Sequence, residues 1–192
     1  MSVGCLARPC EPDPSIDVSG LELRPLEPGD RGAVLEIFEG LGPRSRQLRF
    51  LAAKPRLTSA DLRQLTDVDQ YDHVAILAVD ARHGRPIGVA RFVREPEDPD
   101  TADVAVAVVD DWQDRGVGTM LTTALVRRAR EVGVRRFTMA MAPDNEAAVR
   151  LLHRAPGEIE RLALDDETAE FALALDPAPA PWLQRLLAGP LR

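Results

Sequence analysis

The sequence predicts a single α/β domain in which strands and helices are mixed along the chain. The 192 residues suffice for one well-buried domain, and 45% of them are hydrophobic while 29% are charged, as in ordinary globular proteins. Compact apolar runs of strand type alternate with apolar stripes at helical spacing. One run with apolar residues on both faces leads through a glycine-bearing turn into an amphipathic helix, which indicates a strand inside a sheet that helices cover.

The first half of the predicted domain contains one strand, three helices and a strand pair. The strand begins near Leu21, and Asp30 is expected to cap a helix that starts at about Arg31. Gly42-Pro43 ends that helix, because proline does not continue one. The remaining elements are two short helices, at about 44–53 and from Thr58, and a hairpin of the apolar runs 74–79 and 87–93.

The second half alternates strands and helices before it ends in a strand pair. Residues 102–109 form the strand with two apolar faces, and residues 116–132 form the amphipathic helix that Gly133 closes. The other elements are a buried strand at 137–141, a helix capped by Asp144-Asn145, and two strands at 158–164 and 169–175.

The two ends of the chain differ in composition from the domain, which is expected over residues 20–176. Residues 1–19 are rich in proline and lack apolar periodicity, so an unstructured leader is expected there. Cys5 and Cys10 lie in this leader and are interpreted as tail thiols. Residues 177–192 predict a proline-rich linker and a short C-terminal helix.

Charge and composition exclude several classes of function. The formal net charge of -7 disfavours nonspecific binding to nucleic acid. No run of eighteen apolar residues and no signal-peptide pattern occurs, so no membrane contact is expected and the cytoplasm is the predicted location. The three histidines share no ligand spacing, which argues against a metal enzyme; they are His73, His83 and His153.

The turn between the buried strand and the amphipathic helix carries the strongest functional signal. Gly116 and Gly118 permit close approach to the backbone, and Thr119 adds a hydroxyl. The free N–H groups of a helix start and the helix dipole favour an anion such as a diphosphate. A tight packing turn is the alternative interpretation. The Rossmann and Walker A patterns both fail, because a third glycine and a following lysine are missing.

Gln113, Gly116 and Gly118 resemble motif A of the GNAT acetyltransferases, Gln/Arg-x-x-Gly-x-Gly/Ala. The order of elements over about 21–176 is similar to that family as well. The resemblance implies the GNAT fold, an α/β (α+β) fold with a central, mixed, mostly antiparallel sheet. Such a sheet has about six to seven strands, is flanked by helices and is splayed between its central strands. The resemblance also implies acetyl-CoA as cosubstrate and no metal.

The same resemblance assigns the residues that would hold coenzyme A. The pantetheine arm would lie between the strands 102–109 and 136–142, in contact with Val106 and Val108. Asn145 would help to shape this slot, with a simple helix N-cap as its alternative role. The pyrophosphate would bind the backbone amides of about 114–119 beside Gln113, at the residues Asp114, Arg115, Gly116, Val117, Gly118 and Thr119.

Within the GNAT superfamily the chain most resembles the acetyltransferase domain of bacterial protein lysine acetyltransferases. Residues 43–50, Tyr71-Asp72 and 102–106 carry this resemblance. It implies a protein lysine as acceptor, with a small amine as the alternative, and a homodimer is left open. The arginines of the first segment could pair with an acidic surface of a protein acceptor, or form a solvated charged face; they are Arg44, Arg46 and Arg49.

Asp103 is the candidate catalytic base, because it stands where the related family has a glutamate. Its short side chain would act through water on the acceptor ammonium; a solvated aspartate at the strand entry is the alternative. Leu152 occupies the position at which many relatives have a tyrosine acid. That difference supports a rival function, a noncatalytic acyl-CoA sensor. Tyr71 and His73 are reserve candidates, and Pro156 replaces the usual glycine after the second motif helix.

Overall fold

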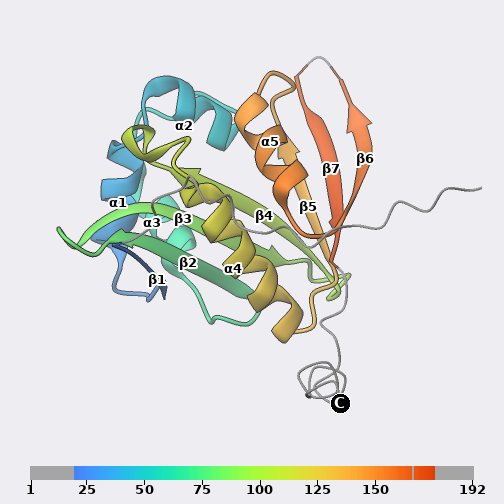
Figure 1. Ribbon diagram of the computed structural model, residues 1–192, viewed down its shortest axis with the longest axis horizontal. Coiled ribbons are helices and arrows are strands. Elements are labelled where there is room, and N and C mark those ends of the chain that lie inside the picture. Colours follow the sequence, from blue (N-terminus) through green and yellow to red (C-terminus); the bar gives the residue numbers. More distant parts are fainter. Residues whose placement is uncertain (1–19, 166, 176–192) are drawn as a thin grey trace, which may run out of the picture.

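A computed structural model describes residues 20–165 and 167–175, and this part of the chain forms one seven-stranded sheet with helices on both faces (Figure 1). The leader 1–19 and the segment 177–192 lie outside the described residues, so their predicted character stays a prediction. The elements are β1 (Leu21–Pro25), α1 (Arg31–Glu39), α2 (Pro43–Phe50), α3 (Ser59–Thr66), β2 (His73–Asp80), β3 (Arg85–Arg94), β4 (Thr101–Val108), η1 (Asp110–Trp112), α4 (Val117–Glu131), β5 (Arg136–Met141), α5 (Glu146–Arg154), β6 (Glu158–Leu164) and β7 (Ala169–Ala174).

The strand order is β1-β2-β3-β4-β5-β7-β6, and all neighbours are antiparallel except β4 and β5. The predicted mixed, mostly antiparallel sheet is therefore confirmed. The one parallel contact covers only Thr101–Asp103 against Arg136–Thr138. Beyond Asp103 the two strands no longer pair, which confirms the predicted splay at the centre of the sheet.

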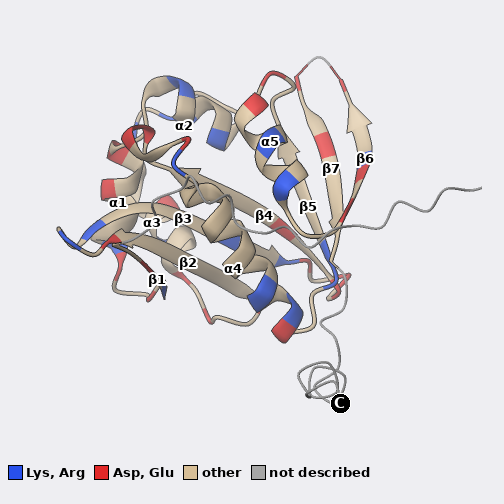
Figure 2. Ribbon diagram, viewed as in Figure 1, with Lys and Arg blue, Asp and Glu red and all other residues tan. Residues whose placement is uncertain are grey.

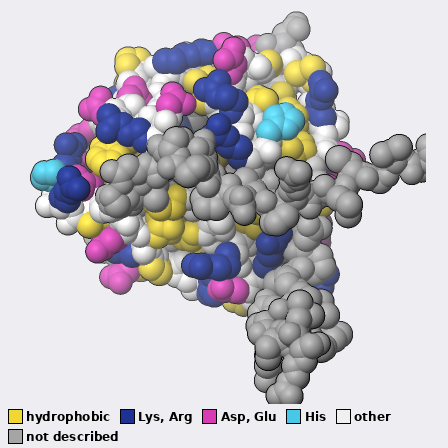
Figure 3. Space-filling view, in the orientation of Figure 1, with side chains coloured by type: hydrophobic (Ala, Val, Ile, Leu, Met, Phe, Trp, Pro, Cys, Tyr) yellow, Lys and Arg dark blue, Asp and Glu magenta, His cyan; other side chains and the backbone are white. Residues whose placement is uncertain are grey.

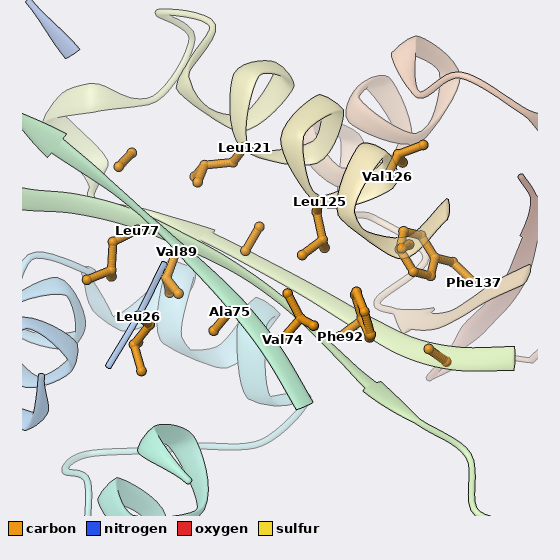
Figure 4. Packing of buried hydrophobic residues seen from close by; sticks show 14 of the residues in the cluster. Leu26, Val74, Ala75, Leu77, Val89, Phe92, Leu121, Leu125, Val126 and Phe137 are labelled. Carbon is orange, nitrogen blue, oxygen red and sulfur yellow. The ribbon is translucent and has the colours of Figure 1, made fainter. Parts of the chain in front are cut away.

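The hydrophobic core lies on both faces of the central strands. Helix α4 packs on β2, β3 and β4, and Leu121 and Leu125 from this helix are completely buried there (Figure 4). Phe92 of β3 and Phe137 of β5 lie on the same face, with ring centroids 5.7 Å apart. Burial of each such side chain contributes roughly 1.5–3 kcal/mol. Helix α1 covers the opposite face of β3.

The start of α1 differs from the expected side-chain cap. Asp30 occupies the N-cap position, as predicted, but its carboxylate makes no capping hydrogen bond. Instead it accepts hydrogen bonds from Arg24 Nη1 at 2.6 Å and from the backbone N–H of Glu27 at 2.8 Å. The arginine, six residues earlier in the chain, competes successfully for the carboxylate because a charged donor forms the stronger hydrogen bond.

The following helices start and end for identifiable local reasons. Helix α2 begins with Pro43 and ends at Phe50, three residues earlier than expected, because Leu51 adopts a left-handed conformation with φ 52°. Helix α3 begins with a complete capping box between Thr58 and Asp61. None of the helices in the described part of the chain has the length and hydropathy needed to span a bilayer.

Candidate active site

The glycine turn before α4 contributes backbone N–H groups that have no partner within the helix. Gly116 is the N-cap of α4 with φ 80°, a left-handed conformation that favours glycine, and it provides no side chain to cap the helix. The first intrahelical bond at this end runs from the N–H of Met120 to the carbonyl of Gly116 at 3.0 Å. The earlier N–H groups, at 117–119, thus remain available for an anion at the positive end of the helix dipole.

A cavity of about 1100 Å³ extends from this turn along the gap between β4 and β5. Helices α2 and α5 flank the gap, and Figure 2 shows basic segments on both. Most residues predicted to hold coenzyme A line this cavity, whereas Val117 is buried in the core. The lining residues among them are Val106, Val108, Gln113, Asp114, Arg115, Gly116, Gly118, Thr119 and Asn145.

The register of β4 decides which of its backbone groups face the gap. The N–H of Val109 donates to Ile87 and the N–H of Glu95 donates to Thr101, so the odd-numbered residues of β4 bond to β3. The even-numbered residues turn their N–H and carbonyl groups toward β5. Because β5 has diverged there, no strand of the described part of the chain pairs with Val106 and Val108 on this side, so their N–H groups can donate to a molecule in the gap.

Side chains around the gap have defined partners. The Gln113 amide donates to the carbonyl of Val108 and to Asp110 Oδ1, both at 3.0 Å, which ties the motif turn to the end of β4. Asn145 Oδ1 accepts the N–H of Ala148 at 3.1 Å, so this residue both caps α5 and lines the cavity. Thr122 also lines the cavity, and its buried hydroxyl has no hydrogen-bond partner among the described residues.

Free helix N–H groups, free strand N–H groups and the Thr122 hydroxyl fit an extended ligand with a diphosphate at one end. The diphosphate would bind the turn, and an amide-bearing arm would lie in the gap. The structure thus brings together the residues that the sequence assigned to coenzyme A, except for the side chain of Val117. Thr122 was not singled out from the sequence. Its signal is its position one helical turn after Gly118, on the same face of α4.

Asp103 lies on β4 where the pairing with β5 ends, opposite Val93 of β3 and Thr138 of β5. Its side chain keeps contact with solvent but lines the cavity, and the loss of solvation there raises the pKa of its carboxyl group. The Arg49 charge acts to lower this pKa, whereas the Glu95 charge acts to raise it. A carboxylate with a raised pKa is a better proton acceptor than an ordinary aspartate.

The three arginines of α2 do not form one surface. Arg44 is exposed and pairs with Asp144 before α5. Arg46 stacks on the Phe38 ring, with its guanidinium carbon 4.3 Å from the centroid, and donates to three backbone carbonyls. Arg49 alone among them lines the cavity. Its half-buried side chain lies near Asp103, whose charge acts on it.

The two reserve candidates, Tyr71 and His73, both contact arginines of β3. The Nε2 atom of His73 lies 3.4 Å from Arg91 Nη1. Because a guanidinium only donates, that nitrogen accepts and the imidazole is neutral. Burial and then the Arg91 charge lower the pKa of His73, which agrees with this assignment. The exposed ring of Tyr71 packs against the guanidinium of Arg94, with 5.1 Å between the guanidinium carbon and the ring centroid.

Arg91 and Glu95 surround the same region but were not singled out from the sequence. The signal for Arg91 is a charged residue within the apolar run 87–93, in a strand that the structure buries almost completely. Glu95 gives no such signal, because it follows the strand in a polar segment. No group of three potential metal ligands occurs in the described ranges. Figure 3 shows basic side chains interspersed with acidic and apolar ones on the face in view.

Comparisons with known proteins agree with this arrangement. The sequence model of the acetyltransferase (GNAT) family matches residues 44–156. Acetyltransferase Pat of Mycolicibacterium smegmatis is 36% identical over 132 residues, which are 69% of this chain and 39% of that relative. An acetyltransferase of Pseudomonas aeruginosa is 30% identical over 148 residues, which are 76% of this chain and 78% of the relative.

Solved structures show the same fold. The GNAT domain of S. lividans PAT has a TM-score of 0.73 at 28% identity, with 80% of this chain and 89% of that chain covered. The cAMP-binding acyltransferase from Mycobacterium smegmatis has a TM-score of 0.57 at 29% identity, with 87% and 48% covered. A Salmonella typhimurium structure with its cofactor acetyl-CoA has a TM-score of 0.66 at 18% identity, with 85% and 98% covered, and shows the fold alone.

The chain thus spans less than half the length of the Mycolicibacterium smegmatis relative and of the cAMP-binding acyltransferase. Its similarity to the Pseudomonas aeruginosa relative covers most of both chains. The family match covers more than half of the sequence and includes the glycine turn, the splayed strands and α5. Together these matches establish that the chain belongs to the acetyltransferase (GNAT) family.

Proposed function

We propose that the protein is an N-acetyltransferase that uses acetyl-CoA and transfers the acetyl group to a primary amine, with a protein lysine as the preferred acceptor. The observation that carries this proposal is the alignment of three features along one cavity. These are the glycine turn, the unpaired N–H groups of β4 and the carboxylate of Asp103. The resemblance of residues 43–50 and 102–106 to bacterial protein lysine acetyltransferases supports lysine as the acceptor.

In the proposed reaction the acceptor enters on the face of the sheet that carries Asp103. A lysine ammonium has a pKa of about 10.4 and no lone pair, so it must lose a proton before it attacks. Asp103 would accept this proton through a water molecule. The amine nitrogen then bonds to the thioester carbon, the bond to sulfur breaks as the thiolate leaves, and the nitrogen gives its second proton to water as the neutral amide forms. The N–H of Val106 or Val108 would stabilise the negative oxygen between these steps.

Leu152 favours a second candidate, a noncatalytic acyl-CoA sensor. This residue is 5% exposed and lines the cavity on α5, where an ionisable acid would serve the leaving thiolate. A thiolate of ordinary pKa, about 8.5, leaves with little help. The acetyltransferase therefore remains the primary proposal, and the sensor is an outcome of its test.

Labelled acetyl-CoA mixed with the protein and either lysine peptides or small amines tests the proposal through thiol release and label transfer. Lys54 is the one lysine of the chain, and its ammonium is engaged by Asp61 Oδ1 at 2.8 Å, so self-acetylation background is low. Lys54→Arg removes the lysine part of that background. We expect label on the peptides. Label on small amines alone would refute the lysine preference, and coenzyme A binding without any transfer would establish the sensor instead.

A further inference from the structure

Arg91 is a buried cation in the middle of β3, on the face of the sheet that carries Asp103. It pairs with Ala75 on β2 and Ala105 on β4, and it is 6% exposed. Its guanidinium donates to the carbonyl of Leu65 at 2.8 Å, near the end of α3, and to neutral His73. Neither partner carries a negative charge. These contacts explain the orientation of the side chain but leave its charge uncompensated.

Arg49 brings a second cation to the same place. Burial and then the charge of Arg49 lower the pKa of Arg91 to about 9, and burial also lowers the pKa of Arg49. Within the described residues no carboxylate lies within 4 Å of either guanidinium. Arg91 is buried without a carboxylate partner, which is costly, and the half-buried Arg49 feels only the Asp103 charge, so this pair of cations favours an anionic ligand.

The geometry also limits the kind of anion. Asp103 lies on the same face of β4 as Ala105, the residue opposite Arg91, and two residues along a strand span about 7 Å. Glu95 is close enough for its charge to act on Asp103. A phosphate dianion would bring two negative charges next to these two carboxylates, whereas a carboxylate brings only one and is therefore repelled less.

We propose that Arg49, which lines the cavity beside Asp103, binds a carboxylate of the acceptor, and that Arg91, buried behind this subsite, adds positive charge to it. This inference rests on the proposed acetyltransferase function and narrows its acceptor class. Guanidinium groups bind carboxylates through two parallel hydrogen bonds, which fixes the orientation of the acceptor. The carboxylate comes from an acidic side chain near the target lysine, or from a small amino acid whose amine is the acceptor.

Matched acceptor pairs test the subsite. One pair is a lysine peptide with Glu or Gln two residues from the acceptor; the other is 4-aminobutyrate and its amide. A charge-assisted contact predicts a kcat/KM roughly 10- to 100-fold higher for the acidic member of the pair that resembles the natural acceptor, peptide or amino acid. Arg49→Gln should bring this ratio close to one, and Arg49→Lys should keep part of it. Arg63→Gln, at an exposed arginine of α3, is the control and should keep the full ratio.

Arg91→Gln removes the second cation but also a contact at the end of α3, so Arg91→Lys is measured beside it and folding is followed by circular dichroism. Peptides with norleucine at the acceptor position give a binding readout without turnover, by calorimetry on the protein saturated with coenzyme A. Tighter binding of the Glu peptide that Arg49→Gln abolishes supports the subsite even if no transfer occurs. Equal kcat/KM and equal affinity for both members of each pair, or a preference for the acidic member that survives Arg49→Gln, would overturn the carboxylate subsite. Acetyl transfer to either member would still support the proposed acetyltransferase function.

Discussion

Substitution of Gly118 separates coenzyme A binding from folding. This residue lies in the first turn of α4 without a left-handed φ, and a Cβ there would meet Leu151 at 3.5 Å and Val108 at 4.0 Å, which are ordinary contacts. Gly118→Ala therefore fits, and it should stabilise the fold by up to about 1 kcal/mol through helix propensity. Gly118→Glu fits the backbone equally well, because an anion in the first turn of a helix is favourable.

The Glu side chain would, however, place a negative charge where the diphosphate is expected. Two unit charges about 5 Å apart repel by about 3 kcal/mol at an effective dielectric constant of about 20, which corresponds to roughly 150-fold weaker binding. Gly118→Gln has the same size without the charge and separates steric from electrostatic loss.

Calorimetry of coenzyme A with the parent and the three variants measures this loss, and thermal unfolding measures their stability. We expect Gly118→Ala to bind nearly as the parent, Gly118→Gln to bind more weakly, and Gly118→Glu to lose at least another factor of about 100. Added salt should reduce the difference in coenzyme A affinity between Gly118→Gln and Gly118→Glu, because it screens the charge. A folded Gly118→Glu variant with parental affinity would show that the pyrophosphate does not bind at this turn.

Three further changes test the catalytic base, the core and a helix cap. Asp103→Asn should slow turnover about 10²- to 10⁴-fold at neutral pH without loss of coenzyme A affinity. Unchanged turnover would contradict the base role. Burial raises the pKa of Asp103, so its carboxyl group stabilises the fold at pH values below its ordinary pKa, and this stabilisation is lost as pH rises through the raised pKa. Asp103→Asn should therefore have a higher melting temperature than the parent at neutral pH. Phe137→Ala should cost about 3–5 kcal/mol in urea unfolding, because it leaves a cavity beside Phe92, whereas the exposed Leu164→Ala serves as control. Lys54 and the Thr58 cap lower the pKa of Asp61 to about 2, so the stability that this carboxylate contributes is lost as pH falls from about 4 through 2. Asp61→Asn should lower the melting temperature at neutral pH and reduce its further fall in acid. Curves of melting temperature against pH that run parallel for parent and variant would refute this assignment.

Local sequence patterns determined the elements and the glycine turn before α4. The apolar periods of β4 and α4 and the Asn145 cap depend on residues a few positions apart, so they are readable from the chain alone. The same holds for the motif from Gln113 to Gly118, whose backbone N–H groups act largely independently of distant segments. Where a neighbour competed for the same side chain, as Arg24 does for Asp30, the local prediction of a cap was wrong.

Only the tertiary structure decided which backbone and side-chain groups face the gap between β4 and β5. The free N–H groups of Val106 and Val108 follow from the register with β3 and from the loss of pairing with β5 after Asp103, and neither is encoded within β4 itself. Arg49 and Arg91 are 42 residues apart in number but act on each other because α2 packs over β4. Arg46, although in the same short helix as Arg49, is instead occupied by backbone carbonyls. Charge partners depend on the packing of segments distant in the chain, which local propensity does not specify.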